Sequence, residues 1–198
     1  MTSKAPILAR IRDVIHRPPL GDRISHWIGA LRIQLERLQT SISDLESREK
    51  ILYQQCMEAM RRGEKDQAAG FGNECVQVRW FVKTATQSQL ILEKAIVRLE
   101  VIREYWDLAR TLQPVRLLVH KARRELEGPL PKISWGLVSV ENSVNETVMS
   151  FKQAADSQSM MRVDEESSTL LDEARTIAES RVSARFPSLP EEFIGSSG

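Results

Sequence analysis

Apolar residues recur every three or four positions along most of the chain, the spacing of a helix with one buried face. In the first such stretch, ten of eleven positions on the predicted buried face are apolar and Glu49 is the exception. The pattern predicts a helix of about 40 residues, roughly 60 Å long, which Gly63 should end. Its buried positions are Ile24, Ile28, Leu31, Leu35, Leu38, Ile42, Leu45, Glu49, Leu52, Cys56 and Ala59.

A second stretch with the same spacing follows after only a few residues. Two long helices joined by so short a connection are expected to pack antiparallel as a hairpin. Gly70 and Gly72 lie early in the second helix, where they either loosen the tip or allow the two backbones to approach closely. The buried positions of this second helix are Ala68, Phe71, Cys75, Val78, Val82, Ala85, Gln89, Leu92, Ile96, Leu99, Ile102, Trp106 and Ala109.

Shorter helices are predicted for the remainder of the chain. Pro114 marks a boundary or a kink, so VRLLVHKARREL is either a short third helix or a continuation of the second. The GPLP sequence at 128–131 is a firm break, and apolar spacing from Ile133 to Ala155 predicts another helix. After a polar linker, DSQSMMRVDEESS, a last helix is predicted to begin near an acidic cluster at 164–166. The expected fold is all-α, a long antiparallel hairpin with two or three short C-terminal helices.

The charge is distributed unevenly. The net charge is +1, but residues 1–126 carry 22 Lys and Arg against 15 Asp and Glu, or +7, whereas residues 127–198 carry 6 against 12, or −6. This asymmetry indicates either an anionic partner for the basic body or a clasp between the two parts of the chain. We divide the chain into an amphipathic N-terminal segment (1–20), a helical core (21–158) and an acidic C-terminal helix with a proline-containing tail (159–198).

Residue patterns typical of catalysis do not occur. His16, His26 and His120 lack the spacing of a di-iron or zinc site, and there is no phosphate-binding loop, GxGxxG or GxSxG motif. We therefore predict a protein that is not an enzyme, with no cofactor, no metal and no small-molecule substrate. Cys56 and Cys75 are expected to be reduced thiols, with a disulfide between the two long helices as the alternative. No apolar run approaches the roughly 20 residues that span a bilayer.

The N-terminal sequence PILARIRDVIHR combines an apolar helical face with positive charge. Such a segment is suited to an anionic membrane interface. The alternatives are a short helix folded onto the hairpin and a mitochondrial transit peptide. The candidate membrane-binding residues are Lys4, Ile7, Leu8, Arg10, Ile11, Arg12, Val14, Ile15 and Arg17.

Basic residues are spread along the two long helices. They form either an ordinary solvated face or a surface for phosphates, although no aromatic stacking platform for nucleic acid accompanies them. The candidate basic face comprises Arg23, Arg32, Arg37, Arg48, Arg61, Arg62, Lys65, Arg79 and Lys83, continued by Lys94 and Arg98.

Three stretches of the chain resemble ESCRT-III proteins, and most closely their archaeal cell-division branch, the CdvB-type paralogues. They are LQTSISDLESREKILYQQCMEAMRRGEKDQAAGFGNECVQVRWF, SQLILEKAIVRLEVI and LLDEARTIAESRVSARFPSLPEE, and the resemblance extends from about Ile24 to Glu192. Only IGSSG follows Phe193, which favours a shorter paralogue without a winged-helix-like C-terminal region.

The resemblance implies a non-enzymatic protein that polymerises with itself and with paralogues on an anionic membrane and constricts it. Its location would be cytoplasmic, peripheral on the inner face of the cell membrane at the division site. The resemblance also implies autoinhibition, in which the acidic regulatory helix holds a closed monomer.

The same resemblance implies a partner for the tail, the MIT domain of an AAA-type ATPase. Phe186, Pro187, Leu189 and Pro190 form an extended, proline-spaced segment of the kind that docks there. Alternatively, Pro187 simply ends the last helix and Leu189 covers its end. For the whole protein, the rival function is a coiled-coil scaffold or a nucleic-acid-binding hairpin without membrane activity.

Overall fold

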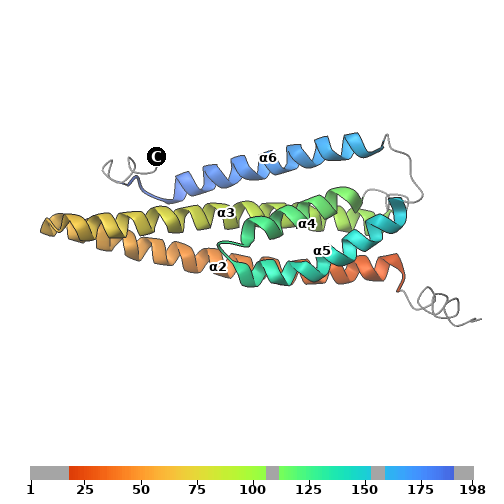
Figure 1. Cartoon of the computed structure of the whole chain (residues 1–198), viewed down its shortest axis with the longest axis horizontal. Coiled ribbons are helices and arrows are strands. Elements are labelled where there is room, and N and C mark those ends of the chain that lie inside the picture. The colour runs from red at the N-terminus through yellow and green to blue at the C-terminus, as the bar shows by residue number, and fades with distance from the viewer. Residues whose placement is uncertain (1–17, 106–111, 153–158, 190–198) are drawn as a thin grey trace, which may run out of the picture.

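A computed structural model describes residues 18–105, 112–152 and 159–189 of the chain. These residues form helices and contain no strand, which confirms the predicted all-α class. Two long helices make a hairpin, two shorter ones cover part of it, and a last one lies along it (Figure 1). The helices are α2 (Leu20–Arg62), α3 (Lys65–Glu104), α4 (Leu112–Leu126), α5 (Pro131–Lys152) and α6 (Ser159–Arg185).

The turn of the hairpin lies where the sequence predicts it. Gly63 has a φ of 76°, a left-handed conformation that glycine adopts without strain. Its N–H donates to the Met60 carbonyl over 3.0 Å, and the N–H of Glu64 donates to the Ala59 carbonyl over 3.0 Å. These bonds satisfy the carbonyls of Ala59 and Met60 in the last turn of α2, and only two residues separate α2 from α3.

The interface between α2 and α3 follows the predicted apolar spacing. Nine of the eleven predicted positions of α2 are buried, and Leu35 and Leu45 are partly buried. Trp27 and Gln34 are also buried, because α5 packs on that side of α2. Trp106 and Ala109 lie outside the described residues.

The second half of α3 is enclosed by neighbours. Ser88, Leu90, Ile91 and Leu92 are consecutive or nearly so and all buried, which one amphipathic stripe cannot produce. Both α4 and α6 pack on α3, in addition to α2. This half of α3 therefore forms the centre of the molecule.

The pair α4 and α5 covers the end of the hairpin that is remote from its turn (Figure 1). Pro114 lies in the first turn of α4, where a missing N–H breaks no helical hydrogen bond, so α4 is a separate helix. Leu112, Leu118 and Leu126 are fully buried along it. The indole N–H of Trp27 on α2 donates to Ser143 Oγ on α5 over 3.0 Å, and this hydrogen bond joins the two helices.

The last helix begins earlier than predicted. Residues 159–168 belong to α6, although the sequence analysis placed them in a polar linker. This stretch contains no glycine or proline, and half of it is Met, Glu or Arg, which have high helix propensity. Polar composition alone therefore did not mark a break in the helix.

Candidate functional site on the face shared by α3 and α6

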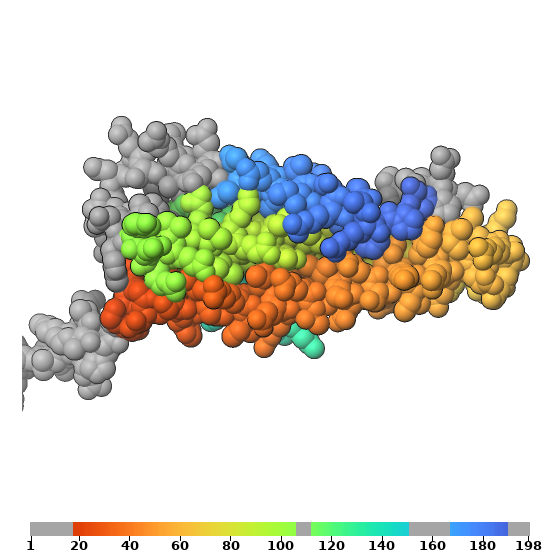
Figure 2. Space-filling view, turned by 180° about the vertical axis from the view of Figure 1, so that it is seen from behind, coloured from red at the N-terminus to blue at the C-terminus, as the bar shows by residue number. Residues whose placement is uncertain are grey.

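The acidic helix lies lengthwise on the hairpin, mainly along α3 (Figure 2). Ala174 and Ala178 are fully buried, whereas Leu170, Leu171 and Val182 are partly buried against the core. Small side chains at the centre of the contact let α6 approach α3 closely, but they bury little apolar area. The alanines alone therefore hold α6 weakly, and the ion pairs and the residues after its last turn add to them.

Ion pairs connect α6 to both long helices. Lys83 Nζ lies 2.8 Å from Glu179 Oε1, Lys94 pairs with Glu173, and Arg185 at the end of α6 pairs with Glu46 of α2. Hydrogen bonds from Lys83 and then from Arg175 lower the pKa of Glu179. These contacts place the acidic C-terminal part of the chain against its basic body, the arrangement that the charge asymmetry allowed.

The end of α6 packs on a buried ion pair. Arg79 donates through Nε to Glu49 Oε1 over 2.7 Å, and the side chains of Glu49 and Arg79 are only 4% and 16% exposed. The Arg79 guanidinium also lies 5.2 Å from the Phe186 ring and 5.9 Å from the Tyr53 ring, within range of cation–π attraction. One cation thus joins α2, α3 and the residue that follows α6.

The proline-containing tail lies against this cluster. The Phe186 N–H closes the last turn by donating to the Val182 carbonyl over 3.2 Å, and α6 ends before Pro187, as the alternative interpretation predicts. Leu189 is only 7% exposed and belongs to the same apolar core as Phe186. Pro190 lies outside the described residues. ATPase docking through these residues stays a prediction.

Most cations of the predicted basic face already have partners in this structure. Arg32 pairs with Glu100 over 2.6 Å, Arg48 with Glu74 over 3.8 Å, and both Arg61 and Arg62 with Glu58. The Arg23 guanidinium contacts Ser143, Thr147 and the Trp27 ring. Arg79 faces inward. Within the described part of the chain, Arg37 and Lys65 make no ion pair.

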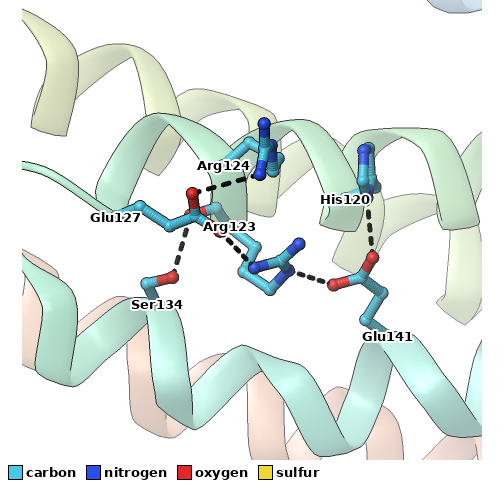
Figure 3. A network of polar contacts seen from close by, with 6 residues as sticks. All are labelled: His120, Arg123, Arg124, Glu127, Ser134 and Glu141. Atoms are coloured by element: carbon cyan, nitrogen blue, oxygen red, sulfur yellow. Dashed lines mark hydrogen bonds and ion pairs between the residues drawn. The ribbon is translucent and has the colours of Figure 1, made fainter.

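A polar network fixes α4 against α5 (Figure 3). Glu141 of α5 contacts His120 Nδ1 over 2.6 Å and pairs with Arg123, and Arg123 also pairs with Glu127. Ser134 Oγ donates to the Arg123 carbonyl over 3.0 Å. Burial alone would raise the pKa of Glu141, but the hydrogen bonds from His120 and Arg123 outweigh it and lower that pKa below its ordinary value of 4.5.

This lowered pKa predicts a pH-dependent contribution to stability. The contribution of ionised Glu141 is complete above pH 4.5 and is lost as the pH falls through the lower pKa of the folded state. We expect Glu141→Gln to lower the free energy of unfolding by about 1–3 kcal/mol at pH 7 and by less at pH 3. Urea unfolding at both pH values, with Glu146→Gln on the exposed side of α5 as control, measures this. An equal loss at both pH values would contradict it.

The two cysteines are free, buried thiols. Cys56 Sγ donates to the Ala68 carbonyl over 3.4 Å, and burial raises its pKa. Burial, followed by the Glu49 carboxylate, raises the pKa of Cys75 to about 11. Neither thiol is activated as a nucleophile. The thiols are free, as expected, but they are fully buried rather than half-buried.

Metal ligands do not gather anywhere in the described residues, since no group of three or more His, Cys, Asp or Glu side chains forms a possible site there. Across the same part of the chain, no helix has the length and apolar character needed to cross a membrane. The candidate membrane-binding residues, from Lys4 to Arg17, lie outside the described residues.

Comparison with known proteins agrees with the resemblance seen in the sequence. The chain is 27% identical over 179 residues to Cell division protein B1 of Sulfolobus acidocaldarius, a match that covers 90% of this chain and 84% of that protein. The chain is a relative of the CdvB-type cell-division proteins. It is also 25% identical over 161 residues to Cell division protein B of the same organism.

The second match covers 81% of this chain but 62% of the relative, so the chain spans less than two thirds of that CdvB-type protein. No family model matches the chain, and no solved structure matches it. The predicted resemblance to the CdvB-type branch of the ESCRT-III family is confirmed by these relatives.

Sequence reasoning missed the ion pair of Glu49 and Arg79. Arg79 was assigned to the basic face, and Glu49 was noted only as a break in the apolar pattern. That break was the available signal, because a carboxylate on a buried helical face needs a partner on the facing helix.

Proposed function

We propose that this chain acts in cell division as a polymer-forming, membrane-remodelling protein, which assembles into filaments on an anionic membrane and drives constriction or scission. The observation that carries the proposal is the acidic α6, which lies on the hairpin and is held there by Lys83, Lys94 and Arg185. The CdvB-type relatives, both named as cell division proteins, support the cellular role.

The hairpin supplies the rigid part of the proposed polymer. Its helices have 43 and 40 residues. Their apolar interface is formed by residues between Ile24 and Ala59 of α2 and between Ala68 and Ile102 of α3. Such a rod has long lateral faces on which copies of the chain and its paralogues can pack side by side. The face beneath α6 becomes available only when α6 leaves it.

The contacts of α6 suit a reversible, autoinhibited state. Its three ion pairs are surface pairs that salt weakens, and its buried centre consists of alanines. Releasing α6 would expose the cations of α3 to phosphates and free Phe186 and Leu189 for an MIT domain of an AAA-type ATPase. In this mechanism, one opening step prepares both the membrane surface and the docking segment.

The N-terminal segment supplies the proposed anchor on the inner face of the membrane. We expect Ile7→Asp/Ile11→Asp to lower the fraction bound to anionic vesicles by about tenfold or more, because two apolar anchors become charged. Vesicle co-sedimentation measures it, and Ile33→Asp, on the exposed outer side of α2, is the matched control. Equal binding by all three chains would remove this segment from the mechanism. No binding by the unaltered chain, with or without α6 in place, would favour the scaffold function.

A further inference from the structure

An exposed apolar strip lies on α3 near its C-terminal end. Val97 and Val101 are one helical turn apart and 58% and 43% exposed, and Tyr105, which ends the helix, is 58% exposed. This half of α3 is otherwise the most enclosed part of the fold, because α2, α4 and α6 all pack on it. The strip is therefore an apolar part of this half of α3 that the described residues leave uncovered.

Acidic residues run beside the strip. Glu93 and Glu100 lie four residues before and three residues after Val97, and Glu104 lies three residues after Val101, so all three share its side of the helix. Glu100 pairs with Arg32 of α2, and Glu93 accepts a hydrogen bond from Gln89 over 2.9 Å. Glu104 is exposed and has no ion-pair partner among the described residues. Lys94, which pairs with Glu173, and Arg98 lie along the opposite edge of the strip. The face thus suits a ligand that is apolar at its centre and basic on the edge that meets the acidic residues.

The segment of this chain that precedes α2 has that character. Its apolar residues recur with helical spacing, and residues 1–17 carry four cations against one Asp. A helix over residues 6–17 would be about 18 Å long, whereas the eight residue steps of the strip span about 12 Å. The residues concerned are Lys4, Ile7, Leu8, Arg10, Ile11, Arg12, Asp13, Val14, Ile15 and Arg17.

The segment also joins the fold at the correct end. The Arg32–Glu100 ion pair sets the register of the hairpin, so α2 begins, at Leu20, beside the end at which α3 terminates. Pro19 is extended, with φ −49° and ψ 148°, and the preceding residue is also a proline. Two prolines at this point do not continue α2 backward as a straight helix, which permits the chain to change direction.

We propose that the amphipathic segment 6–17 docks on the Val97–Val101–Tyr105 strip of its own chain when the protein is not on a membrane. The strip covers the apolar face of the segment, and the acidic residues along α3 attract its arginines. Membrane binding then requires the segment to leave α3, so lipid and α3 compete for the same apolar face. Only this last consequence rests on the proposed function.

Limited proteolysis of the full chain tests the docking. Trypsin can cut after Arg10 and Arg12, whereas the bond after Arg17 precedes a proline. We expect Val97→Gln/Val101→Gln to raise the rate of cutting after Arg10 and Arg12 by about tenfold, because cleavage follows the population of the undocked segment. Glutamine adds no tryptic site and retains helix propensity. The matched control is Val76→Gln, an exposed valine at the other end of α3, which should cut like the unaltered chain.

Two outcomes would overturn the proposal. Equal cutting of all three chains means that the strip does not cover the segment. Protection that rises with protein concentration means that a second copy, rather than the same chain, occupies the strip.

A vesicle assay separates this proposal from the proposed function: Val97→Gln/Val101→Gln should bind anionic vesicles at lower lipid concentration. If no chain binds vesicles but the proteolysis result holds, the docking stands and the membrane function fails.

Discussion

Replacing Glu49 with alanine is expected to lower the free energy of unfolding by about 3–5 kcal/mol, the loss typical of a buried ion pair that loses one partner. Arg79 would keep its charge at 16% side-chain exposure, with its carboxylate at 2.7 Å removed. No other acidic side chain pairs with Arg79 in the described residues. Urea unfolding followed by circular dichroism measures the change.

Two controls define the cause of that loss. Arg48→Ala/Glu74→Ala removes an exposed pair on the same two helices and should change the free energy of unfolding by no more than about 0.5 kcal/mol. Glu49→Leu/Arg79→Met replaces both buried charges and should recover most of the stability lost in Glu49→Ala. If the double variant is no more stable than Glu49→Ala, packing around Glu49 rather than the unpaired Arg79 explains the loss.

Removing the apolar anchors at the end of α6 is expected to detach this helix while the hairpin stays folded. Phe186→Ala/Leu189→Ala deletes the ring over Arg79 and a side chain that is only 7% exposed. Core truncations of this kind cost about 2–5 kcal/mol each. A loss of about 3 kcal/mol in the local contact corresponds to roughly a hundredfold faster amide exchange along α6. Hydrogen exchange read by mass spectrometry resolves α6 from the hairpin.

The matched control for this variant lies on the same helix. Ile177 is 40% exposed on α6, so Ile177→Ala should leave amide exchange in α6 nearly unchanged. Exchange in α2 and α3 should not rise in either variant, because their shared interface is independent of α6. Unchanged exchange of α6 in Phe186→Ala/Leu189→Ala would mean that the ion pairs and alanines suffice to hold this helix.

The hairpin could be predicted because helical periodicity is a local property of the sequence. The spacing from Ile24 to Ala59 required only that one face be buried, and Gly63 marked the turn through its backbone freedom alone. The assignment of α4 as a separate helix depended on Pro114 in its first turn, which the sequence left open. The start of α6 was placed too late because polarity was taken for a break, although no helix-breaking residue was present.

The candidate site was less predictable because its contacts join residues far apart in the sequence. Charge counting gave a clasp between the acidic part and the basic body as one alternative, but it could not identify Lys83 and Glu179 as partners. The role of Arg79 depends on α3 facing Glu49 of α2, and on Phe186, which follows α6, lying against the guanidinium. Similarly, Val97 and Val101 lie off the predicted buried face of the second helix, and the sequence could not show that α4 and α6 leave them uncovered.

The central claim is that α6 restrains a membrane-binding polymer. The most direct test is co-sedimentation with anionic and neutral vesicles across a salt series, followed by negative-stain microscopy of the pellets, for the unaltered chain and for Phe186→Ala/Leu189→Ala. We predict salt-sensitive pelleting with anionic vesicles, stronger for the variant, together with filaments or tubulated vesicles. If both chains stay in the supernatant with every vesicle, and α6 of the variant is shown by amide exchange to be detached, the membrane-remodelling account is contradicted.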